Sequence, residues 1–144
     1  MSMIWLFRLS GITVAGFGAA LLIAPAIISG IYGLSLGADG EVVARILGAA
    51  MLGYLPVDWL AIKGSREVRM LTLRAGLIAE VGGAIAAGVG AIQGRGNTLF
   101  LSVPALFAIF AIWRGYHLVT YGRREVGDLA SGARARTPSV GSGG

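Results

Sequence analysis

The sequence contains no cysteine, a single histidine and few charged residues. Without cysteine there is no disulfide framework, which excludes a small disulfide-stapled domain. One histidine without cysteine argues against a metal site, and we expect no cofactor. Charged residues make up 13% of the chain, against about 25% in a typical soluble domain. This shortage argues against a water-soluble enzyme and against a disordered chain.

Apolar residues and glycine take the place of the missing charge. The chain has 144 residues, 56% of them hydrophobic, with 24 glycines and a mean hydropathy of +0.77. This composition is typical of a protein surrounded by lipid, so we expect the lipid bilayer as a partner. The isoelectric point near 10.5 does not indicate nucleic-acid binding, because a basic cytoplasmic face raises it equally.

Four apolar stretches are separated by short charged or Gly-rich breaks. Each exceeds the roughly 20 residues needed to cross about 30 Å of hydrocarbon, where backbone groups must be paired within helices. Short breaks make sequence neighbours antiparallel. The sequence therefore predicts an all-α membrane protein, with residues 1–121 forming a four-transmembrane-helix antiparallel bundle. The expected spans are about 9–34, 42–63, 70–93 and 98–121.

Lysines and arginines are distributed unevenly between the two ends of this bundle. With a cytoplasmic N-terminus, ten of the twelve lie toward the cytoplasm, and only Arg45 and Arg95 lie toward the other side. The positive-inside rule then predicts a multi-pass inner-membrane protein with both termini in the cytoplasm. Residues 122–144, rich in Gly, Arg and Ser, are expected to form a disordered basic cytoplasmic tail.

A cleavable signal peptide is the alternative interpretation of the first apolar stretch. Arg8, the apolar run and the triplet Ala24-Pro25-Ala26 fit that pattern. The run continues to Leu36, however, whereas a signal-peptide core has only about 7–15 apolar residues. A membrane span is therefore favoured, and Pro25 predicts a kink within it.

Small residues recur every four positions in the apolar stretches, which is typical of helices that pack closely in lipid. The third stretch has the longest such series, and a second face of it combines small residues with Glu80. These faces predict packing against other helices of this chain, other membrane proteins or a second copy. The series is Ala79, Gly83, Ala87 and Ala91, and the second face holds Gly76, Ala84 and Gly88.

Four ionisable residues are expected in one layer near the cytoplasmic ends of the spans. At 1.5 Å per residue, Asp58 and Arg74 lie roughly 7 and 6 Å deep. Arg114 and His117 lie roughly 10 and 6 Å deep. An isolated charge there costs on the order of 3 kcal/mol, so we expect Asp58 to pair with Arg114 or Arg74. An anion or headgroup pocket is the alternative.

Glu80 counts to roughly 15 Å, near the midplane, with no basic residue at the same depth. Two interpretations are open. In one, the carboxyl is neutral, because burial disfavours the charged form, and it hydrogen-bonds Tyr54 at roughly 13 Å on the neighbouring span. In the other, Glu80 is the proton or cation site of a small carrier.

Catalytic motifs are absent from the sequence. There is no Walker loop, HExxH or GxSxG, and Gly82-Gly83 lies inside an apolar stretch where it cannot cradle phosphate. No nucleophile–base pair can be proposed, because His117 has no serine or threonine partner at a defined spacing. We therefore predict no catalytic residue. A membrane enzyme using His117 or Asp58 on a lipid-soluble substrate is the weakest of three hypotheses.

The four short spans, the Arg45-Ile-Leu-Gly48 start of the second span and the basic second turn resemble the small bacterial DoxX-like membrane proteins. The resemblance covers about positions 9–121 and implies little chemistry, since much of that group is functionally obscure. Small multidrug resistance transporters also have four spans and a membrane-embedded glutamate. Their glutamate lies in the first span, however, which carries no charge here.

Two other function hypotheses, both favoured over a membrane enzyme, follow from this pattern. The first is a non-enzymatic accessory or subunit-like bundle, because close-packing surface is abundant and chemical apparatus is scarce. It would bind other membrane proteins or form a homo-oligomer. The alternative is a small proton-coupled carrier that uses Glu80, with Asp58, Arg74 and Arg114 as a gate or headgroup contact.

Overall fold

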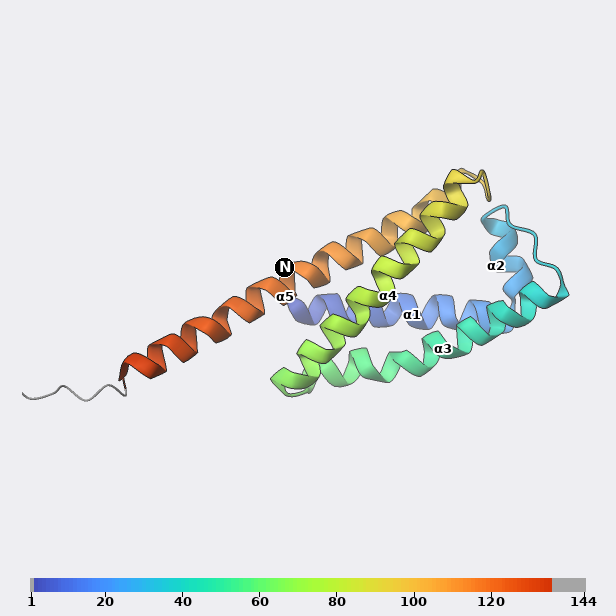
Figure 1. Ribbon diagram of the computed structural model, residues 1–144. Helices are drawn as coiled ribbons and strands as arrows, with labels where there is room; N and C mark the ends of the chain where they lie inside the picture. The colour runs from blue at the N-terminus through green and yellow to red at the C-terminus, as the bar shows by residue number, and fades with distance from the viewer. Residues whose placement is uncertain (1, 136–144) are drawn as a thin grey trace, which may run out of the picture.

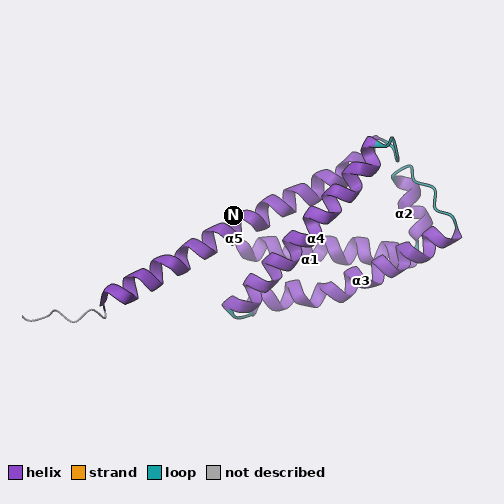
Figure 2. Ribbon diagram, in the orientation of Figure 1, coloured by secondary structure: helices purple, strands orange, loops and turns teal. Residues whose placement is uncertain are grey.

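The computed structural model describes the backbone of residues 2–135 and the side chains of residues 2–121. Over this range the chain consists of helices and short loops, without a strand (Figure 2). The helices are α1 (Met3–Ile23), α2 (Pro25–Ile31), α3 (Ala38–Lys63), α4 (Arg66–Ile92) and α5 (Ser102–Ala135), and a short 3-10 helix, Thr98–Leu101, leads into α5.

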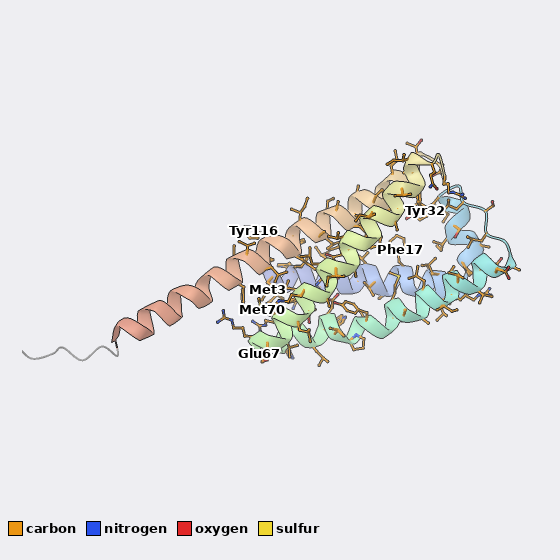
Figure 3. All side chains as sticks on the ribbon, viewed as in Figure 1. Met3, Phe17, Tyr32, Glu67, Met70 and Tyr116 are labelled. Atoms are coloured by element: carbon orange, nitrogen blue, oxygen red, sulfur yellow. The ribbon has the colours of Figure 1, made fainter. Side chains whose placement is uncertain are left out.

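Four helical segments are long and apolar enough to cross a membrane, as the composition predicts. They are α1, α3, α4 and Thr98–Tyr121. Large apolar side chains remain exposed along them, such as Ile78, which is 75% exposed, and Ile92, which is 88% exposed. Figure 3 shows side chains projecting outward along the long helices. The protein is therefore a small multi-span membrane protein whose outer surface contacts lipid.

The first expected span, 9–34, is divided in the structure. α1 ends at Ile23 and α2 begins at Pro25, with Ala24 between them at φ −137° and ψ 59°. Proline has no N–H to donate and disfavours a helical residue before it, so the helix is interrupted here. The apolar helix begins earlier than expected, at Met3, and α2 leaves the direction of α1 (Figure 1). Pro56, by contrast, lies within continuous α3.

The long helices pack as two pairs: α1 lies along α3, and α4 lies along α5. The pairs meet at the end where Gly64 and Ser65 join α3 to α4, and they diverge toward α2 (Figure 1). We call the end where the pairs meet the closed end and the end near α2 the open end. The closed end contains the apolar core, which consists of Leu6, Phe7, Ala61 and Leu73. The four core residues come from α1, α3 and α4, and Phe110, Trp113 and Leu118 of α5 pack against them.

Close packing within each pair depends on glycine. A Cβ atom on Gly48 of α3 would lie 2.6 Å from the carbonyl oxygen of Gly18 on α1, too close for any other residue. In the second pair, a Cβ atom on Gly83 of α4 would lie 2.7 Å from the ring of Phe107 on α5. Several of the small residues that predicted helix packing therefore serve packing inside this chain.

The open end is held by the loop between α4 and α5. The Asn97 backbone N–H donates to the Tyr32 carbonyl oxygen at 2.8 Å, and its side-chain amide donates to the Ile31 carbonyl oxygen at 2.9 Å. Gly33 lies beside Asn97 at φ 72°, a conformation that favours glycine. The Tyr32 ring also stacks on Phe17 of α1, with centroids 6.4 Å apart (Figure 3).

The last helix is longer than expected. The predicted fourth span, 98–121, coincides with the apolar segment Thr98–Tyr121, but α5 itself continues to Ala135, into the range 122–144 that was expected to be a disordered tail. Three glycines in 122–135 disfavour helix, whereas the arginine, glutamate, leucine and alanine residues favour it, and extending an existing helix requires no new nucleus. Residues 136–144, the remainder of the expected tail, lie outside the described residues.

Candidate functional site

An ionic cluster lies buried where the two helix pairs meet, with Arg114 of α5 at its centre. The arginine side chain is 1% exposed, and its Nε donates to Glu80 Oε1 on α4 at 2.6 Å. Its Nη2 donates to Ser10 Oγ on α1 at 2.6 Å and lies 3.4 Å from Asp58 Oδ1 on α3. We call Ser10, Asp58, Thr72, Glu80 and Arg114 the Arg114 cluster. Its members come from all four long helices.

Three further hydrogen bonds complete the cluster. The Ser10 hydroxyl donates to Asp58 Oδ2 at 2.7 Å, so it links the carboxylate to the guanidinium on a second path. The Thr72 carbonyl oxygen accepts from Arg114 Nη1 and from the Tyr54 hydroxyl, each at 3.4 Å. Charge-assisted hydrogen bonds of this kind are the stronger class in proteins, so the cluster binds the helix pairs together.

Gly76 makes room for the guanidinium on α4. A Cβ atom at this position would collide with the guanidinium carbon and nitrogens of Arg114. Thr72, Gly76 and Glu80 are spaced by four, so they share one helix face. That face offers the arginine a carbonyl oxygen, an open space and a carboxylate in succession.

The cluster contains more negative than positive charge. Two buried carboxylates, Asp58 and Glu80, share one guanidinium, so the fully ionised cluster has a net charge of −1. Glu80 Oε2 is buried and has no hydrogen-bond partner among residues 2–121. A buried acceptor without a partner is costly and requires an explanation. A proton or a small cation taken up at Glu80 would remove the excess negative charge of the cluster.

The predicted layer of four ionisable residues is only partly assembled. Asp58 and Arg114 meet, but Arg74 has an exposed position on α4 outside the cluster. Of the two arginines expected as partners of Asp58, Arg114 makes the contact, and Arg74 lies on another side of α4 because a helix turns about 100° per residue. Arg74 is two residues from both Thr72 and Gly76, so it points away from the face that they share.

His117 is buried but bonded within its own helix. Its Nε2 accepts a hydrogen bond from Trp113 Nε1 at 3.1 Å, one turn earlier on α5. The Tyr116 ring lies edge-on to the imidazole with centroids 5.4 Å apart, while Tyr116 itself is 62% exposed (Figure 3). His117 therefore contributes to packing beside Trp113, and its hydrogen bond does not extend to Asp58.

Glu80 bonds Arg114, although the sequence placed no basic residue at the depth of Glu80. Counting residues from the end of a span gives only the depth of each Cα atom. The side chains of Glu80 and Arg114, however, lean toward each other along the bundle. α4 and α5 run in opposite directions because a short loop joins them, and each Cα–Cβ bond tilts toward the N-terminus of its own helix. The Tyr54 hydroxyl, expected to bond Glu80, donates to the Thr72 carbonyl oxygen instead.

Three residues of this site were not predicted as site residues: Ser10, Thr72 and Gly76. A signal for two of them exists in the sequence, since Thr72 and Gly76 precede Glu80 at steps of four. Ser10 is a polar residue within the first apolar stretch, at its start, and no spacing rule links it to Asp58, 48 residues later. Only the packing of α1 along α3 brings these two together.

A second concave feature lies at the open end of the bundle. It is a groove of about 390 Å³ between α1, α2 and α5, lined almost entirely by apolar side chains that include Ile12, Phe17 and Leu106. No charged residue lines it. Because this lining offers little polar chemistry, we place the polar chemistry of the protein at the Arg114 cluster.

Comparison with protein-family models, with curated proteins and with solved structures finds no match to this chain. The resemblance to DoxX-like proteins is therefore one of layout and a few residues, and no family is identified. The fold and the Arg114 cluster are the findings on which a function can be argued.

Proposed function

We propose that this protein is a small proton-coupled carrier, with the Arg114 cluster as its proton site and Glu80 as the residue that takes up the proton. One observation carries the proposal: two buried carboxylates share a single buried guanidinium, and one Glu80 oxygen has no partner among residues 2–121. Ionisable groups retained inside a membrane are typical of proton and ion pathways.

The cluster links the charge on Glu80 to the arrangement of the helices. An ionised Glu80 holds Arg114 by a 2.6 Å hydrogen bond. A protonated carboxyl holds a guanidinium less strongly, because the charge-assisted bond is lost. Arg114 then remains bonded to Ser10 and Asp58, which belong to the other helix pair. Proton uptake thereby shifts Arg114 from α4 toward α1 and α3, and a carrier requires such coupling between its charge and its shape.

We further propose that the protein lies in the inner membrane with both termini in the cytoplasm. The excess of lysine and arginine at the closed end and on the C-terminal segment supports this orientation through the positive-inside rule. The Arg114 cluster then lies on the cytoplasmic side of the bundle, and the open end with α2 faces the opposite side.

The proton site is tested by infrared difference spectroscopy of the purified protein in vesicles during a pH titration. A protonated carboxyl has its own C=O stretch. We expect a titrating carboxyl band that Glu80→Gln removes. The matched control is Glu67→Gln, which changes an exposed acid held by Ser65 at the helix start and should leave the band in place. A band that persists in Glu80→Gln contradicts Glu80 as the proton site.

Carrier activity is tested in vesicles that contain a trapped pH-sensitive dye. A potassium diffusion potential drives protons inward, and the internal pH reports the flux. We expect wild-type protein and Glu67→Gln to acidify the lumen faster than empty vesicles, and Glu80→Gln not to do so. An unchanged rate in Glu80→Gln would show that the flux does not depend on this carboxyl.

An accessory or subunit-like role is the second candidate function. It is favoured by Gly82 and Gly88 of α4, where an added Cβ atom would meet nothing within 4 Å, so another helix could approach closely. The test is mild detergent extraction followed by native mass spectrometry. A stoichiometric protein partner, lost in the double variant Gly82→Leu and Gly88→Leu, supports this role. A monomer in both proteins contradicts it.

A further inference from the structure

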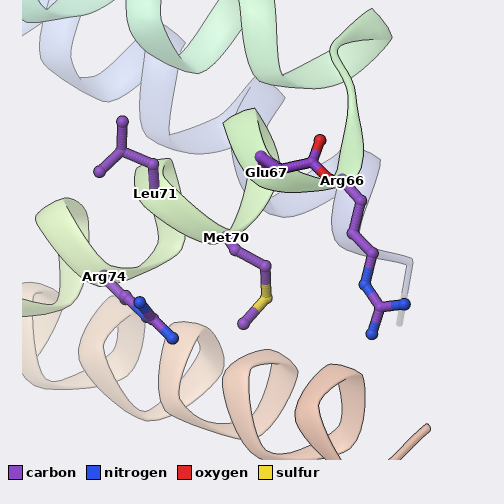
Figure 4. A pocket seen from close by; sticks show the side chains of 5 residues that line it. All are labelled: Arg66, Glu67, Met70, Leu71 and Arg74. Atoms are coloured by element: carbon purple, nitrogen blue, oxygen red, sulfur yellow. The ribbon is translucent and has the colours of Figure 1, made fainter. Parts of the chain in front are cut away.

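A notch of about 270 Å³ lies beside the first two turns of α4, at the closed end of the bundle. Its lining consists of Arg66, Glu67, Met70, Leu71 and Arg74. Arg66, Met70 and Arg74 are spaced by four, so they follow one side of the helix. Figure 4 shows both guanidinium groups and the Met70 side chain on that side. The notch therefore combines two positive charges with an apolar floor.

Arg74 has no bonding partner in the part of the chain whose side chains are described. Its α4 neighbours Thr72 and Glu80 are engaged in the Arg114 cluster, and Arg69 donates to the Ala61 and Ile62 carbonyl oxygens. An arginine side chain that extends from a membrane helix and has no protein partner places its charged end in the headgroup region. Arg74 is thus the available donor of the notch.

Arg66 is held in position at the other side of Met70. Its guanidinium lies over the Tyr121 ring at 5.6 Å from the centroid, and its Nη2 donates to the Tyr121 carbonyl oxygen at 3.3 Å. The Cα atoms of Arg66 and Arg74 are about 12 Å apart along the helix, at 1.5 Å per residue. Two long arginine side chains can span that distance around a single phosphate group.

Glu67 also lines the notch and would repel an anion if it faced the arginines. Its Oε2 accepts a hydrogen bond from the Ser65 hydroxyl at 2.6 Å, at the start of α4. Figure 4 shows its carboxylate directed away from both guanidinium groups. The side of the notch formed by Arg66, Met70 and Arg74 therefore presents positive charge.

We propose that this notch binds the phosphate of an anionic phospholipid, with Arg74 as the main donor and Arg66 as the second positive charge. A lipid fits better than free phosphate because Met70 and Leu71 add apolar lining, and Leu71 is 67% exposed toward the surrounding bilayer. Guanidinium groups match phosphate oxygens in geometry and in charge. The proposal does not depend on the proton site, since no residue of the notch belongs to the Arg114 cluster.

The test uses the purified full chain in detergent and native mass spectrometry with added phosphatidylglycerol or phosphatidylcholine. We expect a phosphatidylglycerol adduct that exceeds the phosphatidylcholine adduct in wild-type protein. Arg74→Gln should weaken phosphatidylglycerol binding about fivefold, since one basic residue near anionic lipid has an effect of this size. Arg74→Lys keeps the charge and should retain most of the binding. The matched control is Arg45→Gln, an exposed arginine at the opposite end of the bundle.

Four outcomes would overturn the proposal. The first is equal binding of the two lipids by wild-type protein. The second is equal phosphatidylglycerol binding by wild-type protein and Arg74→Gln, with Arg74→Gln still eluting as a folded monodisperse species. The third is full displacement of phosphatidylglycerol by millimolar inorganic phosphate, which would assign the site to the free anion. A loss that occurs equally in Arg45→Gln would indicate a general charge effect and would also reject the notch.

Discussion

The guanidinium of Arg114 occupies the space beside Gly76 where any other residue would place its Cβ atom. This relationship explains how a fully buried arginine fits between closely packed helices. The missing side chain on α4 lets the guanidinium reach Glu80 on one side and the Thr72 carbonyl oxygen on the other. The glycine is thus part of the ionic cluster although it carries no polar side chain.

Gly76→Ala is expected to destabilise the protein by about 1–3 kcal/mol, because the added methyl group collides with Arg114 and overpacks the site. The measurement is the free energy of unfolding in mixed micelles. Gly82→Ala is the matched control on the same helix, since an added Cβ atom there meets nothing within 4 Å. Equal stability of the two variants would show that Arg114 does not need the space at Gly76.

Arg114→Met is expected to cost about 3–5 kcal/mol, because it leaves two buried carboxylates without their shared cation. The control is Arg45→Met, which removes a partly exposed pair with Glu41 and should change stability by about 1 kcal/mol at most. Thermal unfolding of both variants in the same detergent provides the comparison. Adding Glu80→Gln to Arg114→Met should recover part of the loss, and a further loss would contradict the charge balance of the cluster.

Ser10→Ala should cost about 1–3 kcal/mol although the change removes only one hydroxyl. Ser10 accepts from Arg114 Nη2 and donates to Asp58 Oδ2, so both charged groups lose a close partner in a buried position. Ser102→Ala is the control, because that exposed hydroxyl donates only to the Leu99 carbonyl oxygen one turn earlier. Chemical unfolding distinguishes the two variants, and equal stability would refute the bridging role of Ser10.

Gly48→Ala should separate α1 from α3, because its Cβ atom would lie 2.6 Å from the Gly18 carbonyl oxygen and 2.7 Å from the Leu22 nitrogen. Backbone atoms cannot move aside as a flexible side chain can, so we expect a loss of about 1–3 kcal/mol. Gly53→Ala on the same helix meets nothing within 4 Å and serves as the control. Cysteine cross-linking between α1 and α3 should become slower in Gly48→Ala only.

The spans could be predicted from sequence because length and hydropathy alone decide whether a helix can cross a bilayer. The break at Pro25 is harder to predict, since proline bends some membrane helices and ends others. Pro56 lies inside α3, whereas Pro25 begins a new helix, and both are preceded by apolar residues. The difference arises from the surrounding packing, which a single sequence does not contain.

The site could be predicted only in part, because the inward face of each helix is not marked by a polar pattern. Depth offered Arg114 and Arg74 as partners of Asp58, and the structure pairs Asp58 with Arg114. Arg74 has a similar depth but points away from the cluster. Depth alone does not tell toward which side of its helix a residue points. The bond between Arg114 and Glu80 depends on side-chain direction, which counting along the helix axis ignores.

Because Arg114 lies on the last helix, the order of synthesis matters for the cluster. Its partners Ser10, Asp58 and Glu80 belong to helices that emerge earlier from the ribosome. Until α5 enters the bilayer, the two acids face lipid without a cation, at a cost on the order of 3 kcal/mol for each charged group. Insertion of the final helix therefore supplies the cation that the acids on the earlier helices need in the membrane. A nascent chain that stops short of Arg114 leaves Asp58 and Glu80 without a partner.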